Sequence, residues 1–232
     1  QSLMWALSRQ EINSNTFDLM ICDEAHQNYL WEKTSDFIET FSCKKIWFTA
    51  SPELKDKTVE NLFKEKIDEY LLDEAIKDWV LPQIKTWKVY KIKNSEFDKL
   101  EIENWEYTQK SLDNFDVRET FPDILESLKN WELKWKQIAI FLPSIALSKE
   151  LSEYLKLNGV KTEHIDWQSQ NREEIQESFE NKDIQVICNC EVLKASWDSD
   201  IIDGVIILKP TLSPANYIQM IELISNPNAW VA

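Results

Sequence analysis

The sequence predicts an α/β protein built from two parallel-sheet domains. Short apolar segments typical of buried strands alternate with amphipathic segments typical of helices. This rhythm occurs once in the first 70 residues and again from residue 137 onward. We therefore expect domains at 1–84 and 135–232, separated by a connector with helices at 85–134.

Two apolar segments predict the strands of the first domain. Residues 17–22 and 45–49 are short apolar runs, and we expect each to form a buried strand. Helices are expected at three ranges: 1–12, 32–41 and about 55–66. Residues 84–93 alternate in polarity and are predicted to be extended.

The connector is charged, and its residues 96–134 are predicted to be mainly helical, with Pro122 near a helix start. The second domain has strand-like segments at 137–143, 160–165, 184–189 and 204–209. Its helix-like segments are 144–159, 169–181 and 213–224. Ser144 and Ser213 are suited to begin helices, and Gly159 is suited to end one.

Composition limits what the chain can be. Apolar residues make up 43% of the 232 residues, which is enough for a sizeable core. There is no apolar run of about 18 residues and no signal peptide, so we expect a cytoplasmic protein. The chain opens on Gln1 rather than Met, which indicates a fragment. The net charge of −15 argues against nucleic-acid binding by the whole surface, but it allows a local basic groove.

The segment "FDLMICDEAHQNY" places two carboxylates directly after the first predicted strand. Chemistry in parallel sheets gathers at the carboxyl ends of the strands, where Asp23 and Glu24 stand. One such carboxylate can hold Mg²⁺, and a second can orient an attacking water. The alternative is a capped strand end followed by a solvated turn.

Other segments accompany this pair. "FTASP", at 48–52, follows the second predicted strand, with Ser51 in its fourth position. "AIFLPSIALSKELSEYL" begins the second domain, and 171–221 follows it. At these residues the sequence resembles the DExH-box helicases of superfamily two. "ICDEAH" looks like their Walker B box and "FTASP" like their T-A-T-P motif, while the later segments resemble motifs IV, V and VI.

The resemblance covers nearly the whole chain apart from 94–134. It implies two RecA-like domains, the first truncated at its N-terminus, that bind ATP and Mg²⁺ and act on nucleic acid. DNA is expected in preference to RNA, with a nuclease or methylation subunit as a possible partner.

The resemblance also implies roles for individual residues. Asp23 would hold the metal, Glu24 would orient water and His26 would sense the γ-phosphate, with Gln219 completing the catalytic set. Coupling between domains would involve Thr49, Ser51 and Asp198. The residues expected near the nucleic-acid backbone or the cleft are Ser144, Asn189, Thr211 and Ser213. For these four, a helix-cap or turn role is the open alternative.

Two motifs depart from the family pattern. No G-x-x-x-x-G-K-[ST] segment occurs in the chain, so we expect this fragment alone to be inactive. Glu222 and Leu223 stand where the family has Gly-Arg, and Asn226 replaces a second arginine. Either the last residues are misread, or the chain is an inactive helicase-like module that binds nucleic acid or a protein.

The glycine and tryptophan counts are unusual, with two glycines and eleven tryptophans. Five tryptophans stand where the resembling family has glycine: Trp31, Trp47, Trp79, Trp135 and Trp167. An aromatic-rich core would explain the count but not this coincidence. Our hypothesis is that UGA codons, read as glycine in the source organism, appear here as tryptophan.

Overall fold

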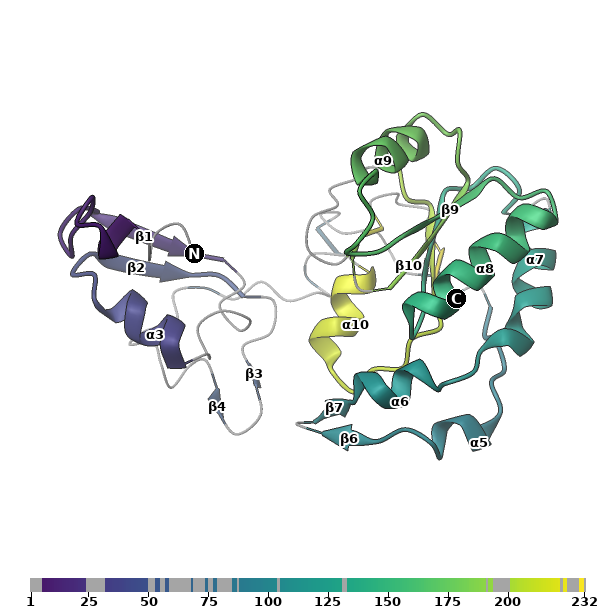
Figure 1. Cartoon of the computed structure of the whole chain (residues 1–232), viewed down its shortest axis with the longest axis horizontal. Helices are drawn as coiled ribbons and strands as arrows, with labels where there is room; N and C mark the ends of the chain where they lie inside the picture. The colour runs from purple at the N-terminus through teal and green to yellow at the C-terminus, as the bar shows by residue number, and fades with distance from the viewer. Residues whose placement is uncertain are drawn as a thin grey trace. The chain divides into compact units, whose positions relative to one another are not determined.

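The computed structural model divides into two compact units, Gln1–Glu69 and Tyr70–Ala232 (Figure 1). The division falls earlier in the chain than the expected end of the first domain at residue 84. The structure describes residues 6–23, 32–49, 53–54, 57–58, 68, 74, 77–78, 85–86, 88–103, 105–130, 133–190, 192–193, 201–221, 223–224 and 230–231.

The first unit contains the two predicted strands. Strand β1 (Leu19–Cys22) pairs in parallel with β2 (Lys44–Trp47), and helix α3 (Glu32–Glu39) lies between them in the chain. Residues 6–8 are helical, inside the range expected for the first helix. The order strand, helix, parallel strand is the one that the sequence predicts.

The prediction that these two strands are buried is wrong. Leu19 is 46% exposed and Ile21 is 63% exposed, and both lie on the same face of β1 because side chains alternate along a strand. Three aromatic rings form a cluster nearby, with the Phe17 and Phe41 centroids 5.7 Å apart and the Phe37 and Phe41 centroids 5.4 Å apart. In β2 no described residue is fully buried, and within the described part of this unit β1 and β2 pair only with each other.

The expected helix at 55–66 also needs correction at its start. Strands β3 (Glu53–Leu54) and β4 (Lys57–Thr58) form a short antiparallel ladder, so the chain turns back on itself at this point. Residues 59–66 lie outside the described residues.

The second unit is built on one parallel sheet, as the sequence predicts. Its strands are β5 (Lys85–Thr86), β8 (Ile138–Phe141), β9 (Thr162–Ile165), β10 (Val186–Asn189), β11 (Gly204–Ile207) and β12 (Trp230–Val231). Their order is β5-β12-β11-β8-β10-β9, and each neighbouring pair is parallel. Strand β12 carries no sequence signal long enough to predict it.

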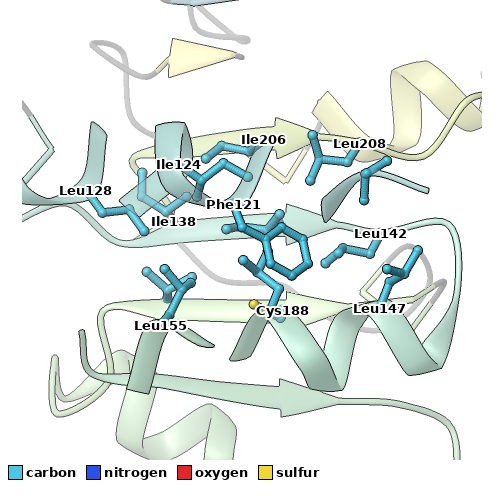
Figure 2. Packing of buried hydrophobic residues seen from close by; sticks show 14 of the residues in the cluster. Phe121, Ile124, Leu128, Ile138, Leu142, Leu147, Leu155, Cys188, Ile206 and Leu208 are labelled. Atoms are coloured by element: carbon cyan, nitrogen blue, oxygen red, sulfur yellow. The ribbon is translucent and has the colours of Figure 1, made fainter. Parts of the chain in front are cut away.

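Helices cover both faces of this sheet. Side chains of α7 (Phe121–Lys129) and α8 (Ile145–Leu157) pack with Ile138 and Ile140 on one face (Figure 2). Side chains of α9 (Arg172–Glu180) and α10 (Pro214–Ile221) pack with Phe141 on the other. The strict alternation along β8 thus divides the core into two layers.

Described residues of the expected connector pack on the second unit. The connector contains α5 (Asn94–Phe97), β6 (Ile102–Glu103), β7 (Glu106–Tyr107), α6 (Gln109–Asp113), a 3-10 turn (Arg118–Thr120) and α7. Phe115 and Val117 are fully buried in the core under α7. Pro122 stands in the first turn of α7, as predicted. The β6–β7 hairpin was not predicted, because two-residue strands show no period.

The ends of α8 match their sequence signals. The Ser144 hydroxyl accepts a 3.2 Å hydrogen bond from the Leu147 amide, and Gly159 has a φ of +81° just after the helix. Among the described helices, none is both long and apolar enough to span a membrane.

Candidate functional site

The first candidate group stands where β1 and β2 end. Asp23 directly follows β1, and Phe48 directly follows β2, with the Phe48 amide donating a 2.9 Å hydrogen bond to the Cys22 carbonyl. Because the two strands run parallel, Asp23 and Thr49 leave the sheet at the same edge. Asp23 is exposed and Thr49 is half-buried. This edge therefore presents one carboxylate beside the segment that follows the neighbouring strand.

Four other predicted residues cannot be placed. Glu24, His26, Ser51 and Asp198 lie outside the described residues. Their roles stay predictions from the sequence.

The second candidate group lies at the carboxyl edge of the larger sheet. Ser144 follows β8, Asn189 ends β10, and Thr211 and Ser213 follow β11. Parallel strands bring these four residues to one edge, as the sequence implies. Gln219 lies within α10 and is 8% exposed.

Asn189 and Ser144 are buried at this edge. The Asn189 Nδ2 atom donates to the Ile140 carbonyl at 3.0 Å, and the Leu142 amide donates to the Asn189 carbonyl at 2.9 Å. The Asn189 Oδ1 atom has no hydrogen-bond partner among the described residues. Ser144 caps α8 and is 2% exposed. Both side chains hold the edge together, so a ligand would reach them only after a local rearrangement.

Thr211 and Ser213 lie just before the start of α10. The Thr211 hydroxyl accepts a 3.1 Å hydrogen bond from the Ser213 amide, and the Ser213 hydroxyl accepts a 3.3 Å hydrogen bond from the Asn216 amide. Both residues are half-buried. They are the more accessible pair of the four predicted backbone contacts.

Glu106 is a site residue that the sequence did not indicate. Its carboxylate accepts hydrogen bonds from the Thr211 hydroxyl at 2.6 Å, the Leu212 amide at 2.9 Å and the Asn216 side-chain amide at 3.1 Å. Partial burial raises the pKa of Glu106, but these bonds and one from the Tyr107 amide outweigh it, so the net pKa lies below the ordinary value. The contact joins residues 105 positions apart, and no local pattern in the sequence could have revealed it.

A second unpredicted cluster stands at the end of β9. Asp166 is 2% exposed and accepts from His164 Nε2 at 3.0 Å, from Lys149 Nζ at 3.2 Å and from the Gln168 amide at 2.8 Å. Burial raises the pKa of Asp166, but these donors hold it well below its usual range. The Arg172 Nε atom donates to the Asp166 carbonyl at 3.0 Å and so helps to shape this turn.

This cluster includes a serine, a histidine and an aspartate, yet its geometry is that of a brace. The Ser148 Oγ atom lies 2.7 Å from His164 Nδ1, and Ser148 is 0% exposed within α8. A nucleophilic hydroxyl must reach a substrate, so burial argues against hydrolytic chemistry here. The cluster fixes α8 to β9.

Leu223 is one of the residues that depart from the motif of the resembling family. It is partly buried and packs against the core cluster formed by α9, α10 and the sheet. Glu222 and Asn226 lie outside the described residues.

Comparison with known proteins identifies a conserved domain in the second half of the chain. Residues 118–222 match the helicase conserved C-terminal domain. The chain is 27% identical over 233 residues to the "Putative ATP-dependent helicase IRC3" of Saccharomyces cerevisiae, covering 95% of this chain and 33% of that protein. Residues 118–222 therefore carry a helicase conserved C-terminal domain.

Two further similarities agree with this assignment of the helicase C-terminal domain. A "51.5 kDa protein" of a Lactococcus phage (isolate 7-9) is 23% identical over 207 residues, which are 87% of this chain and 44% of that protein. The structure of S. cerevisiae Dbp5 bound to RNA and ADP BeF3 matches 99% of this chain and 56% of that one, with a TM-score of 0.63 and 17% identity. That likeness establishes the RecA-like fold.

The chain spans less than half the length of the two relatives that it matches in sequence. Its helicase C-terminal domain match begins inside the expected connector, at residue 118. The segment with α7, which packs on the sheet, is therefore part of that domain.

Proposed function

We propose that the protein to which this chain belongs is a nucleic-acid-dependent ATPase that unwinds or translocates along nucleic acid. The helicase C-terminal domain supports a helicase-family role. The observation that carries the proposal is the shared strand edge of the first unit, where Asp23 follows β1 and Thr49 follows β2. ATP-hydrolysing motors need a carboxylate and a coupling segment at such an edge.

In this proposal, Asp23 binds Mg²⁺, Glu24 orients the attacking water and His26 responds to the γ-phosphate. An exposed carboxylate is an oxygen ligand of the kind that Mg²⁺ prefers, so Asp23 suits the ion. When bound, Mg²⁺ would neutralise charge on the phosphates of ATP. The chain's own residues hold the ion and orient the attacking water.

Residues of both expected domains supply the remaining roles. Gln219 belongs to the catalytic set, while Thr49, Ser51 and Asp198 couple ATP state to the grip on nucleic acid. Contacts with the nucleic-acid backbone are assigned to Ser144, Asn189, Thr211 and Ser213. The common strand edge of these last four supports their grouping.

We further propose DNA as the substrate in preference to RNA, and a nuclease or methylation subunit as partner. The segment "DEAIKDWVLP", at 73–82, resembles one that follows the first motor domain in relatives of type I and III restriction subunits and of repair helicases. Backbone contacts alone make such motors tolerant of sequence. The chain by itself is expected to be inactive, since it lacks a phosphate-binding loop of its own.

The residue at position 223 supports a second candidate function, that of an inactive module. Leu223 stands where the resembling family has an arginine, and it packs in the core. An aliphatic side chain cannot stabilise the charge of a transferred phosphate. This favours an inactive helicase-like module that binds nucleic acid or a protein.

Matched substitutions on one strand test the motor. Asp23→Asn in the full-length protein removes the proposed metal ligand, whereas Asp18→Asn changes an exposed carboxylate at the opposite end of β1. We expect Asp23→Asn to lower nucleic-acid-stimulated ATP hydrolysis at least about 100-fold and Asp18→Asn to leave it within about twofold. Equal rates for the two variants would contradict the role of Asp23. A folded full-length protein without stimulated hydrolysis would favour the binding module.

A further inference from the structure

A carboxylate of the chain itself already binds the surface around Thr211. Glu106 Oε2 accepts from the Thr211 hydroxyl at 2.6 Å and from the Asn216 side-chain amide at 3.1 Å. Glu106 Oε1 accepts from the Leu212 amide at 2.9 Å. A hydroxyl, a backbone amide and a side-chain amide thus converge on one anion.

These donors are of the kinds that bind a backbone phosphate. Protein contacts to phosphate oxygens come from hydroxyl, amide and backbone N–H groups, often at the start of a helix. A carboxylate presents two anionic oxygens to the same donors. Each of these N–H or O–H groups makes only one good hydrogen bond at a time. Glu106 and a phosphate would therefore compete for the donors of Thr211, Leu212 and Asn216.

The segment that carries Glu106 is weakly held elsewhere. Strands β6 and β7 have two residues each, and isolated two-stranded ladders are marginal in water. Ile102 is 63% exposed and Trp105 is 71% exposed, so the hairpin buries little apolar surface through them. Glu103 and Glu106 are directly opposite in the ladder, and like charges at such positions destabilise it.

We propose that Glu106 is an autoinhibitory latch on the second domain: its carboxylate occupies the position of a nucleic-acid phosphate beside Thr211 and must leave before the backbone binds. The latch rests on the proposed function, since that function assigns Thr211 to the nucleic acid. It adds a competing group and two further phosphate donors, the Leu212 amide and the Asn216 side chain. The partner chemistry is a single-stranded phosphodiester backbone.

Binding of a fluorescein-labelled 20-nucleotide single strand to the full chain tests the latch by fluorescence anisotropy at fixed salt. Glu106→Ala removes the carboxylate, and Glu106→Gln keeps the side-chain length while replacing one acceptor oxygen by a donor. Glu103→Ala is the matched control, because it removes the same charge from the same hairpin. Thr211→Ala is made both alone and in combination with Glu106→Ala, and the thermal unfolding of each variant is recorded.

We expect both Glu106 variants to bind about tenfold more tightly, as happens when a competing closed state is removed, and Glu103→Ala to change affinity less than about twofold. Thr211→Ala should cancel the gain. If Glu106→Ala and Glu103→Ala gain equally, charge alone explains the effect and the latch is wrong. A third outcome is that the wild type binds the strand, that Thr211→Ala weakens this binding, and that the Glu106 variants have the same affinity as the wild type. The latch then fails while the proposed function stands. If neither the wild type nor the Glu106 variants bind, the proposed backbone contacts fail and the latch fails with them.

Discussion

The Nε2 atom of His164 lies 3.0 Å from Oδ2 of Asp166, at the point where β9 leaves the sheet. An ionised carboxylate can only accept, so the Nε2 atom carries a proton, while the Nδ1 atom lies 2.7 Å from the Ser148 hydroxyl oxygen. The chain of contacts therefore ties α8, β9 and the following turn into one rigid corner.

Replacing Asp166 by Asn should destabilise this corner. The substitution leaves Lys149 and His164 with a weaker acceptor in a buried setting, and we expect the free energy of unfolding to fall by about 2 kcal/mol at pH 7. Urea denaturation measures this loss. Asp183→Asn, at an exposed position, is the control and should change stability by less than about 0.5 kcal/mol. A loss no larger than that of the control would show that the cluster does not brace the fold.

The Glu106 contact predicts a dependence of stability on pH. The folded-state pKa of Glu106 lies below its ordinary value, so its contribution is present above the unfolded pKa and disappears as pH falls through the folded pKa. We expect the wild type to exceed Glu106→Gln in unfolding free energy by about 1 kcal/mol at pH 7, a figure reduced for the exposure of the group. This difference should shrink below about pH 4. A difference that stays constant from pH 7 to pH 3 would contradict the assigned cause.

Trp105 occupies a backbone conformation that suits glycine. Its φ is +65°, which costs a non-glycine residue about 1–2 kcal/mol, and its side chain is 71% exposed. Trp105→Gly should therefore raise the free energy of unfolding by about 1 kcal/mol, measured by denaturation. Trp135→Gly is the comparison, because Trp135 is 80% exposed but does not have a positive φ. If both substitutions destabilise the chain alike, backbone strain at Trp105 is not the reason.

This conformation bears on the excess of tryptophan over glycine. Trp105 stands in the turn between Glu103 and Glu106, where short hairpins favour glycine. Glycine at this position is what the UGA hypothesis expects. Peptide masses of the protein from its native source decide the matter: glycine masses at Trp79 and Trp167 would support recoding, and tryptophan masses there would end it.

The second sheet could be predicted because its signals are local. The four strand-like segments and the helix caps at Ser144 and Gly159 follow from periodicity and from neighbouring residues. Strand β12 and the β6–β7 hairpin could not, because each strand has two residues. The burial expected of β1 failed because the pattern of a strand does not state how many neighbours will cover it.

Some parts of the candidate site could likewise be predicted from the sequence, and others could not. The ends of strands can be predicted from the sequence, and the structure places Asp23 and Thr49 after two neighbouring parallel strands. Contacts between residues far apart in the chain cannot be predicted from local patterns. The hydrogen bond from the Thr211 hydroxyl to the Glu106 carboxylate is therefore visible only in the structure.

The rate of ATP hydrolysis by the full-length protein, measured as single-stranded nucleic acid is titrated in with Mg²⁺ present, tests the proposed motor most directly. We predict a saturable rise in the rate, to at least about tenfold above the basal value. A rate that stays flat while the folded protein binds the strand would contradict the motor and leave the chain as a binding module.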